Sequence, residues 1–277
     1  DNIESQQDDP KEIQENVNRL YQTLLEFNVI RPEDNINVDA NLGPTVTQYT
    51  FTPPTGVKLK NITSLESDIA LKLKAESIRI EAPIPGKSLV GIEVPNRTAA
   101  MVRLGNLLQY PEFMASGPLG IPLGRDVSGD PIFANIAKMP HLLIAGATGS
   151  GKSIFVHSLI TSLLFKNSPA TLRLALVDPK RVELSMYSSL PHLALPVVTE
   201  NKKALAVLRW AIQEMEQRYE LFAQVGSRDI ASYNAKHKDT SMPYIVIVID
   251  EMADLMATFG REVEGYIIRL AQMARAT

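Results

Sequence analysis

Residues 139–153, MPHLLIAGATGSGKS, decide the fold. The apolar run 141–145 predicts a strand, and the apolar residues after Ser153 recur at the spacing of a helix. Between them, residues 146–153 follow the pattern Gly-x-x-x-x-Gly-Lys-Ser. A strand, a glycine-rich loop and a helix in this order bring backbone N–H groups and the positive end of the helix to one anion. We therefore interpret the stretch as a nucleotide phosphate loop rather than as a chance glycine-rich turn.

Each residue type in this loop has a chemical role. The glycines let the backbone turn tightly and approach phosphate oxygens closely. Lys152 is expected to reach the β- and γ-phosphates of ATP, and the hydroxyl of Ser153 is expected to bind Mg²⁺. The predicted phosphate-binding residues are Gly146, Ala147, Thr148, Gly149, Ser150, Gly151, Lys152 and Ser153.

A second apolar run, residues 244–249, ends in Asp250 and Glu251. A carboxylate at the tip of such a strand can hold the Mg²⁺ that Ser153 binds, so we assign Asp250 to the metal. Glu251 then lies where a base can orient the attacking water. Lys152 and Glu251 are thus the predicted catalytic residues, and the Asp-Glu pair favours an ATP hydrolase over a simple nucleotide binder.

A third apolar run, residues 172–177, is followed by Asp178-Pro179-Lys180-Arg181. Ligands of open α/β folds bind at the carboxyl ends of the strands, where these residues are expected to lie. Lys180 and Arg181 are secondary candidates for contact with a phosphate or with a neighbouring subunit. Asp178 fits a turn cap equally well, because Asp-Pro is an ordinary turn pair.

The second half of the chain alternates strands with helices, the helices being predicted at 153–165, 203–222 and 262–275. This alternation predicts an α/β fold, a parallel sheet with helices on both faces. We assign residues 136–277 to this ATPase domain. Residues 115–135 are rich in glycine and proline and are assigned to a linker with a hairpin.

The sequence pattern of residues 1–114 predicts a small α+β domain. Asp9-Pro10 is typical of a helix start, and a helical pattern continues to about Phe27. This half shows no cluster of His, Asp and Glu and no nucleophile motif, so we predict a role in packing and assembly. The other expected elements are strands within 36–52 around a turn at 41–44, a helix at 59–73, strands at 77–81 and 89–94, and a helix at 102–108.

Composition excludes several classes of protein. Among 277 residues there is no cysteine, so disulfides and thiolate metal sites are excluded. The four histidines lack metal-ligand spacing, and His141 and His157, in apolar contexts, are interpreted as core residues. No apolar run approaches the roughly 18–20 residues of a membrane span, so no membrane contact is expected from this stretch. The net charge is −3, so any contact with nucleic acid must come from local Lys and Arg groups.

Three classes of phosphate-loop protein compete for this sequence. A GTPase needs a guanine-reading Asn-Lys-x-Asp segment, and the nearest match, residues 201–204, lacks the Asp. A small-molecule kinase needs a lid and seldom has a Glu beside the metal-binding Asp. A motor or helicase-type ATPase uses the Asp-Glu pair and normally acts as a ring, and the sequence favours this class.

Several segments closely resemble the FtsK/SpoIIIE family of double-stranded DNA translocases. The small domain resembles the family's α domain at residues 82–87 and 94–96. In the ATPase half the resemblance is carried by residues 139–153, 177–180, 183–185, 191–193, 249–256 and 269–277.

The resemblance implies a RecA-like P-loop ATPase core in a homo-oligomer, a hexameric ring around duplex DNA, with ATP bound between subunits. It implies roles in chromosome segregation during division or sporulation. It also implies a cytoplasmic motor within a longer parent protein that is anchored in the bacterial inner membrane at the septum. Because the sequence begins at Asp1 and ends at Thr277 within a helical pattern, we expect a piece of that parent, with a trans-acting Arg, a sensor strand and DNA contacts beyond Thr277. The alternative is a regulatory or structural ATP-binding module that does not pump DNA.

Overall fold

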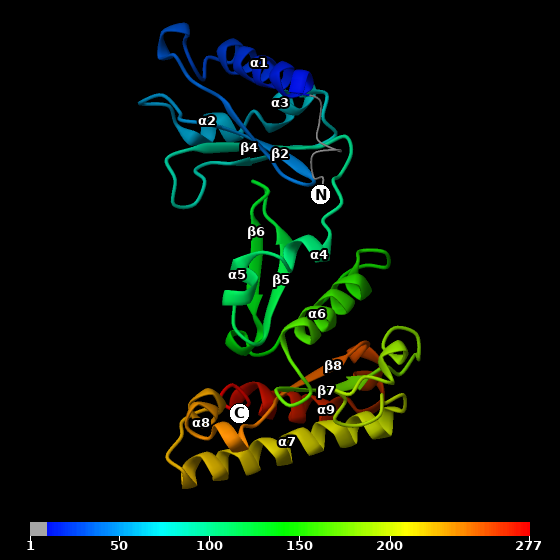
Figure 1. Ribbon diagram of the computed structural model, residues 1–277. Coiled ribbons are helices and arrows are strands. Elements are labelled where there is room, and N and C mark those ends of the chain that lie inside the picture. Colours follow the sequence, from blue (N-terminus) through cyan, green and yellow to red (C-terminus); the bar gives the residue numbers. More distant parts are fainter. Residues whose placement is uncertain (1–9) are drawn as a thin grey trace. The chain divides into compact units, whose positions relative to one another are not determined.

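The computed structural model describes residues 10–277, so the predicted helix cap Asp9 lies outside the described residues. The chain divides into two compact units (Figure 1). The first comprises Asp1–Tyr110 and Pro122–Phe133, and the second comprises Pro111–Ile121 and Ala134–Thr277. A hairpin of two strands, β5 (Gly120–Arg125) and β6 (Pro131–Asn135), contributes residues to both units.

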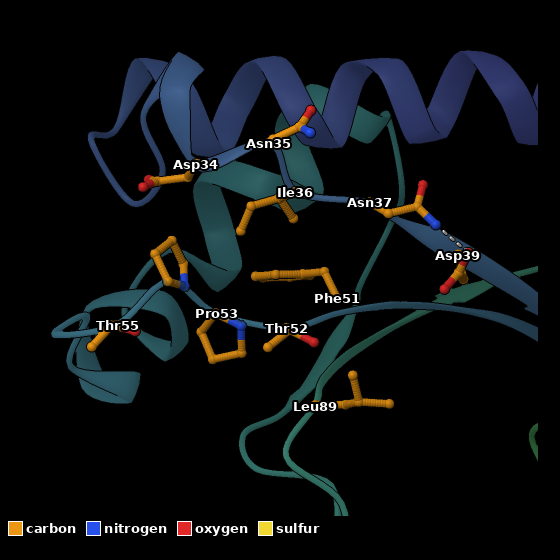
Figure 2. Close-up of a pocket in the computed structure, with 11 residues that line it drawn as sticks. Asp34, Asn35, Ile36, Asn37, Asp39, Phe51, Thr52, Pro53, Thr55 and Leu89 are labelled. Carbon is orange, nitrogen blue, oxygen red and sulfur yellow. Dashed lines mark hydrogen bonds between the residues drawn. The ribbon is translucent and has the colours of Figure 1, made fainter.

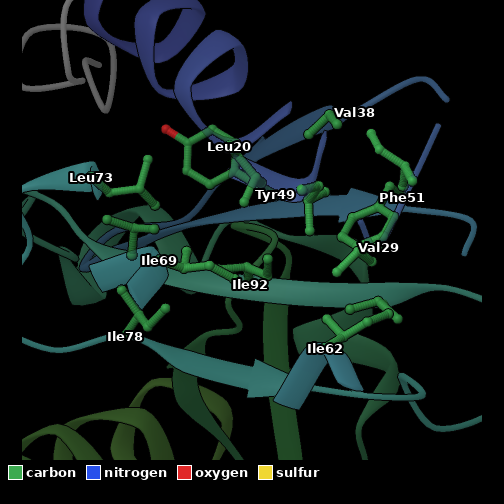
Figure 3. Packing of buried hydrophobic residues seen from close by; sticks show 14 residues of the cluster. Leu20, Val29, Val38, Tyr49, Phe51, Ile62, Ile69, Leu73, Ile78 and Ile92 are labelled. Carbon is green, nitrogen blue, oxygen red and sulfur yellow. The ribbon is translucent and has the colours of Figure 1, made fainter. Parts of the chain in front are cut away.

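The first unit is built on an antiparallel four-stranded sheet in the order β1-β2-β4-β3. Leu20 of helix α1 and Ile69 of helix α3 pack with Tyr49 and Ile92 of the sheet in one buried cluster (Figure 3). The elements of this unit are α1 (Pro10–Glu26), β1 (Asp39–Leu42), β2 (Val46–Phe51), α2 (Leu59–Thr63), α3 (Glu66–Leu73), β3 (Arg79–Glu81), β4 (Val90–Pro95) and α4 (Leu104–Leu107).

The expected α+β organisation of this unit is confirmed, but the single helix predicted at 59–73 is wrong. Two helices, α2 and α3, meet at Ser64 and Leu65. At the end of α2 the Thr63 hydroxyl donates to the Lys60 carbonyl oxygen at 3.2 Å, and the Ser64 hydroxyl donates to the Asn61 carbonyl oxygen at 3.0 Å. Such side-chain bonds to the backbone compete with continuation of the helix.

The second unit is centred on two parallel strands, β7 (Leu172–Val177) and β8 (Tyr244–Ile249). Leu172, Leu174 and Leu176 pack into the cluster of helix α6 (Lys152–Lys166) on one face. Ala175 and Val177 pack into the cluster of α7 (Asn201–Gln224) and α9 (Met252–Met273) on the opposite face. Alternate residues of a strand point to opposite faces, so the predicted parallel sheet with helices on both faces is confirmed.

Three helices of this unit were missed or begin far from their predicted start. The short helices α5 (Pro111–Ala115) and α8 (Ile230–Lys236) were not predicted. Helix α9 begins ten residues before the predicted start at 262. It continues through a non-helical residue, Phe259, immediately before Gly260.

The strand predicted at 141–145 is also wrong, because the structure has irregular backbone there. Leu142 and Leu143 are 41% and 84% exposed. An apolar run forms a strand where another strand pairs with its backbone. In the described part of the chain both edges of β7 are occupied, by β8 and by residues 193–198, and residues 141–145 do not pair with the other edge of β8, so they form no strand.

Among the described residues, no helix combines the length and the apolar character that crossing a membrane requires.

Candidate nucleotide-binding site

The predicted phosphate loop has the backbone conformation that its glycines allow. Gly149 and Gly151 have φ angles of 81° and 94°, a region that side chains with a Cβ rarely adopt. A Cβ on Gly146 would lie 2.1 Å from the Ser150 hydroxyl oxygen, so the Ser150 side chain would have to move to admit one. Helix α6 begins at Lys152, directly after the loop.

Residues 145–151 are exposed, and the loop opens to solvent at the N-terminus of α6. The first N–H groups of a helix lack partners within the helix and carry its positive end. Ala147, Thr148 and Ser150 lie on the turn before it, where the Ser150 N–H donates to the Ala147 carbonyl oxygen at 3.0 Å. The loop and the start of α6 are therefore accessible to an anion from solvent.

The ends of β7 and β8 lie side by side. Val177 pairs with Ile249 in register, and the Asp250 N–H donates to the Val177 carbonyl oxygen at 3.0 Å. Asp178 and the pair Asp250-Glu251 therefore leave the sheet at the same edge, as the sequence predicts.

Glu251 lies between two lysines. Its Oε2 is 3.1 Å from Lys180 Nζ and 3.8 Å from Lys152 Nζ. The hydrogen bond from Lys180, with smaller contributions from the charges of both lysines, outweighs burial and lowers the pKa of Glu251. The same bond raises the pKa of Lys180. The phosphate-loop lysine, Lys152, therefore contacts the predicted base, Glu251. Lys180, a secondary candidate, contacts the same carboxylate.

Asp250 is partly buried near other carboxylates. Burial raises its pKa, and the charges of Asp178, Glu183 and Glu251 add to the effect, while Lys152 opposes it. Its Oδ1 is buried and has no hydrogen-bond partner among the described residues. A buried oxygen of this kind fits a cation ligand, since a positive charge would supply what the protein does not.

Ser153 donates its hydroxyl proton to Glu183 Oε1 at 2.8 Å. Glu183 Oε2 lies 3.4 Å from His157 Nε2, and His157 Nδ1 lies 2.8 Å from the Tyr187 hydroxyl. The interpretation of His157 as a core residue is wrong, because its side chain is 27% exposed at this cluster. His141 is exposed as well.

Asp178 organises the loop that carries Lys180 and Glu183. Its side chain is fully buried and accepts from the Leu184 N–H at 2.9 Å, the Val182 N–H at 3.3 Å and the Ser185 hydroxyl at 3.3 Å. Burial alone would raise its pKa, but these hydrogen bonds together lower it. The turn-cap interpretation of Asp178 fits this geometry.

Arg181 is not brought to the lysine pair. Its side chain is exposed, and its backbone has a φ of 59°. Its N–H donates to the Asp178 carbonyl oxygen at 3.1 Å.

The residues present fit Mg²⁺ bound together with a nucleotide. Among the described residues, no three His, Cys, Asp or Glu side chains gather as an all-protein metal cage. Mg²⁺ usually takes only one or two protein ligands and completes its shell with waters and substrate phosphates. Asp250 and Ser153 correspond to that smaller set.

A pocket in the first unit has a different character (Figure 2). It lies between residues 34–39 and 51–55, with the buried ring of Phe51 among its lining residues. The Asn37 amide donates to Asp39 Oδ1 at 2.7 Å. The lining carries no Lys, Arg or His, so it does not fit a phosphate group.

Comparison with known proteins identifies curated relatives over nearly the whole chain. The "DNA translocase FtsK" of Caldanaerobacter subterraneus subsp. tengcongensis is 51% identical over 95% of this chain and 36% of its own length. The "DNA translocase SftA" of Bacillus subtilis is 48% identical over 98% of this chain and 28% of its own length. The chain therefore spans only about a third of the length of these relatives.

Two solved structures share the fold. A monomer form of the pCW3 conjugation coupling protein TcpA with ATPγS aligns with a TM-score of 0.56 and 24% identity, over 95% of this chain and 75% of its own. The cytoplasmic domain of the Type VII secretion ATPase EccC of Thermomonospora curvata aligns with a TM-score of 0.52 and 26% identity, over 65% of this chain and 24% of its own.

Family models divide the chain in two. The model of the FtsK alpha domain matches residues 1–96, and the model of the FtsK/SpoIIIE family matches residues 104–277, more than half of the chain. The latter match includes the phosphate loop, the Asp178 segment and the Asp250-Glu251 pair. The chain belongs to the FtsK/SpoIIIE family.

Proposed function

We propose that this chain is part of an ATP-driven motor that translocates double-stranded DNA. The proposal rests on one arrangement of side chains. Lys152 and Lys180 both contact the Glu251 carboxylate, and the neighbouring Asp250 has a buried oxygen without a hydrogen-bond partner among the described residues. The phosphate loop that ends at Lys152 is exposed to solvent. The names of the curated relatives, DNA translocases, support DNA as the polymer on which the motor acts, and the duplex form is part of our proposal.

The residues have distinct tasks in ATP hydrolysis. The loop from Gly146 to Gly151 and the Lys152 ammonium bind the phosphates, and Ser153 and Asp250 hold Mg²⁺. The metal would neutralise charge on the β- and γ-phosphates. Glu251 orients the attacking water, and its lowered pKa keeps it ionised at neutral pH. Lys180 positions the Glu251 carboxylate through its hydrogen bond.

Assembly completes the motor in this proposal. Copies of the chain form a hexameric ring around DNA, and a neighbouring subunit supplies an Arg to each site. DNA is gripped through its phosphates without base readout, which makes binding sensitive to salt and tolerant of sequence. The parent protein acts in chromosome segregation at division or sporulation, with its motor in the cytoplasm and its anchor in the inner membrane at the septum.

Displacement of a third strand from a DNA triplex by the full-length protein tests this proposal. We expect displacement with ATP and Mg²⁺, and none when Glu251→Gln replaces the wild type. If the protein hydrolyses ATP equally with and without duplex DNA and displaces nothing, it is a regulatory ATP-binding module instead.

A further inference from the structure

We propose that Glu183 is a positioning residue for the hydroxyl of Ser153, which it turns toward the metal. The inference rests on the proposed nucleotide site. A serine hydroxyl has one proton to donate and two lone pairs to offer. When a lone pair binds a cation, the proton needs an acceptor elsewhere. Glu183 Oε1, at 2.8 Å from Ser153 Oγ, is that acceptor.

Glu183 is held from its other side. Its Oε2 faces His157 Nε2 at 3.4 Å, and His157 Nδ1 is fixed by the Tyr187 hydroxyl at 2.8 Å. Ser153 and His157 are four residues apart on α6, so they lie on one face of the helix and contact the two oxygens of the same carboxylate. The carboxylate therefore has little freedom to rotate away from the serine.

The backbone around Glu183 is fixed as well. The next residue, Leu184, is fully buried, and its N–H donates to the buried Asp178 carboxylate at 2.9 Å. A residue anchored at its backbone and at both carboxylate oxygens can orient a metal ligand as outer-shell partners do.

Glu183 and Asp250 have different roles in this arrangement. Glu183 accepts the proton of Ser153, whereas Asp250 Oδ1 has no partner among the described residues and stays open to the cation. Loss of Glu183 should leave the Ser153 proton without its acceptor and the hydroxyl free to rotate away from the cation.

The test measures how tightly the full-length protein binds Mn²⁺ in the presence of a non-hydrolysable ATP analogue. Electron paramagnetic resonance detects the bound Mn²⁺, so the test does not depend on turnover. We expect Glu183→Ala to weaken Mn²⁺ binding by roughly 10- to 100-fold. Glu183→Gln keeps the size and one acceptor oxygen, so its loss should be smaller. Glu264→Ala, which removes an exposed carboxylate of α9, is the matched control and should bind Mn²⁺ like the wild type.

Two further measurements separate positioning from a merely structural role. Binding of the analogue in EDTA should be the same for the wild type and Glu183→Ala. In a double-mutant cycle, Glu183→Ala should have no added effect on Mn²⁺ affinity once Ser153→Ala is present, because the two residues act as one unit.

The inference is overturned if Glu183→Ala binds Mn²⁺ within twofold of the Glu264→Ala control, if both variants of Glu183 lose the analogue equally in EDTA, or if the effects of Glu183→Ala and Ser153→Ala simply add. A wild-type protein that binds no nucleotide would overturn the proposed function itself. Wild-type binding with an unaffected Glu183→Ala variant would overturn only the role of Glu183.

Discussion

The Asp178→Asn substitution should destabilise the second unit without changing the size of a side chain. Asp178 is fully buried and accepts three hydrogen bonds, from two backbone N–H groups and one hydroxyl. An amide offers one oxygen where the carboxylate has two, and its NH₂ group would face groups that are themselves donors. At least one buried N–H then loses its partner.

The magnitude follows from the number of bonds affected. A hydrogen bond to a charged group contributes about 1.5–3 kcal/mol, and an unpaired buried donor costs about 1–3 kcal/mol. Relief of repulsion between Asp178 and Asp250 returns part of this loss. We expect the free energy of unfolding to fall by about 2–4 kcal/mol at pH 7.

Urea unfolding followed by the fluorescence of Trp210, the single tryptophan of the chain, measures this change in the second unit. Asp239→Asn, in an exposed 3-10 helix, is the matched control. Hydrogen bonds lower the pKa of Asp178 in the folded state, so its stabilisation exists above the ordinary pKa near 4 and disappears as the pH falls through the folded value. The difference between the two variants should be constant above about pH 5 and shrink in acid. Equal stabilities, or a difference that persists unchanged at about pH 2, would refute the reasoning.

Three further substitutions probe the site and its support. Glu251→Gln should bind ATP within a few-fold of wild type but hydrolyse it roughly 100-fold more slowly, measured by phosphate release, because a carboxylate is needed to orient the water; near-normal turnover would remove Glu251 from the mechanism. Lys152→Ala should weaken binding of a fluorescent ATP analogue by roughly 10- to 100-fold, since charge-assisted bonds to phosphate are lost; unaltered affinity would contradict the phosphate-loop assignment. Arg218→Ala removes a buried guanidinium that bonds Glu214 and the Pro243 and Thr277 carbonyl oxygens. Its free energy of unfolding in urea should fall by about 2–3 kcal/mol, and a change below about 0.5 kcal/mol would be inconsistent with that network.

Local patterns predicted the centre of the second unit well. Both β7 and β8 have the predicted bounds, and α6 differs from its prediction by one residue at each end. Continuous apolar runs between polar segments leave little choice for these elements. The prediction that Asp178 and the pair Asp250-Glu251 lie at the same edge of the sheet followed from the parallel arrangement of the strands alone.

Features that depend on tertiary partners were not predictable. Residues 141–145 have the composition of a strand but no pairing partner in the described chain. Contact between Ser153 and Glu183 depends on the path of the loop after β7, which the buried Asp178 carboxylate fixes through hydrogen bonds to residues 182–185. No local spacing in the sequence predicts contact between Ser153 and a glutamate 30 residues further along the chain. The phosphate-loop assignments stay predictions until the variants above are measured.

The most direct test of the proposed DNA motor is the ATPase rate of the full-length protein with and without duplex DNA, measured from low to high salt. We predict strong stimulation by duplexes of any sequence at low salt, and a steady decline as salt displaces the protein from DNA phosphates. Glu251→Gln, the control, should show no stimulation. A wild-type rate that duplex DNA leaves unchanged at low salt would contradict the account.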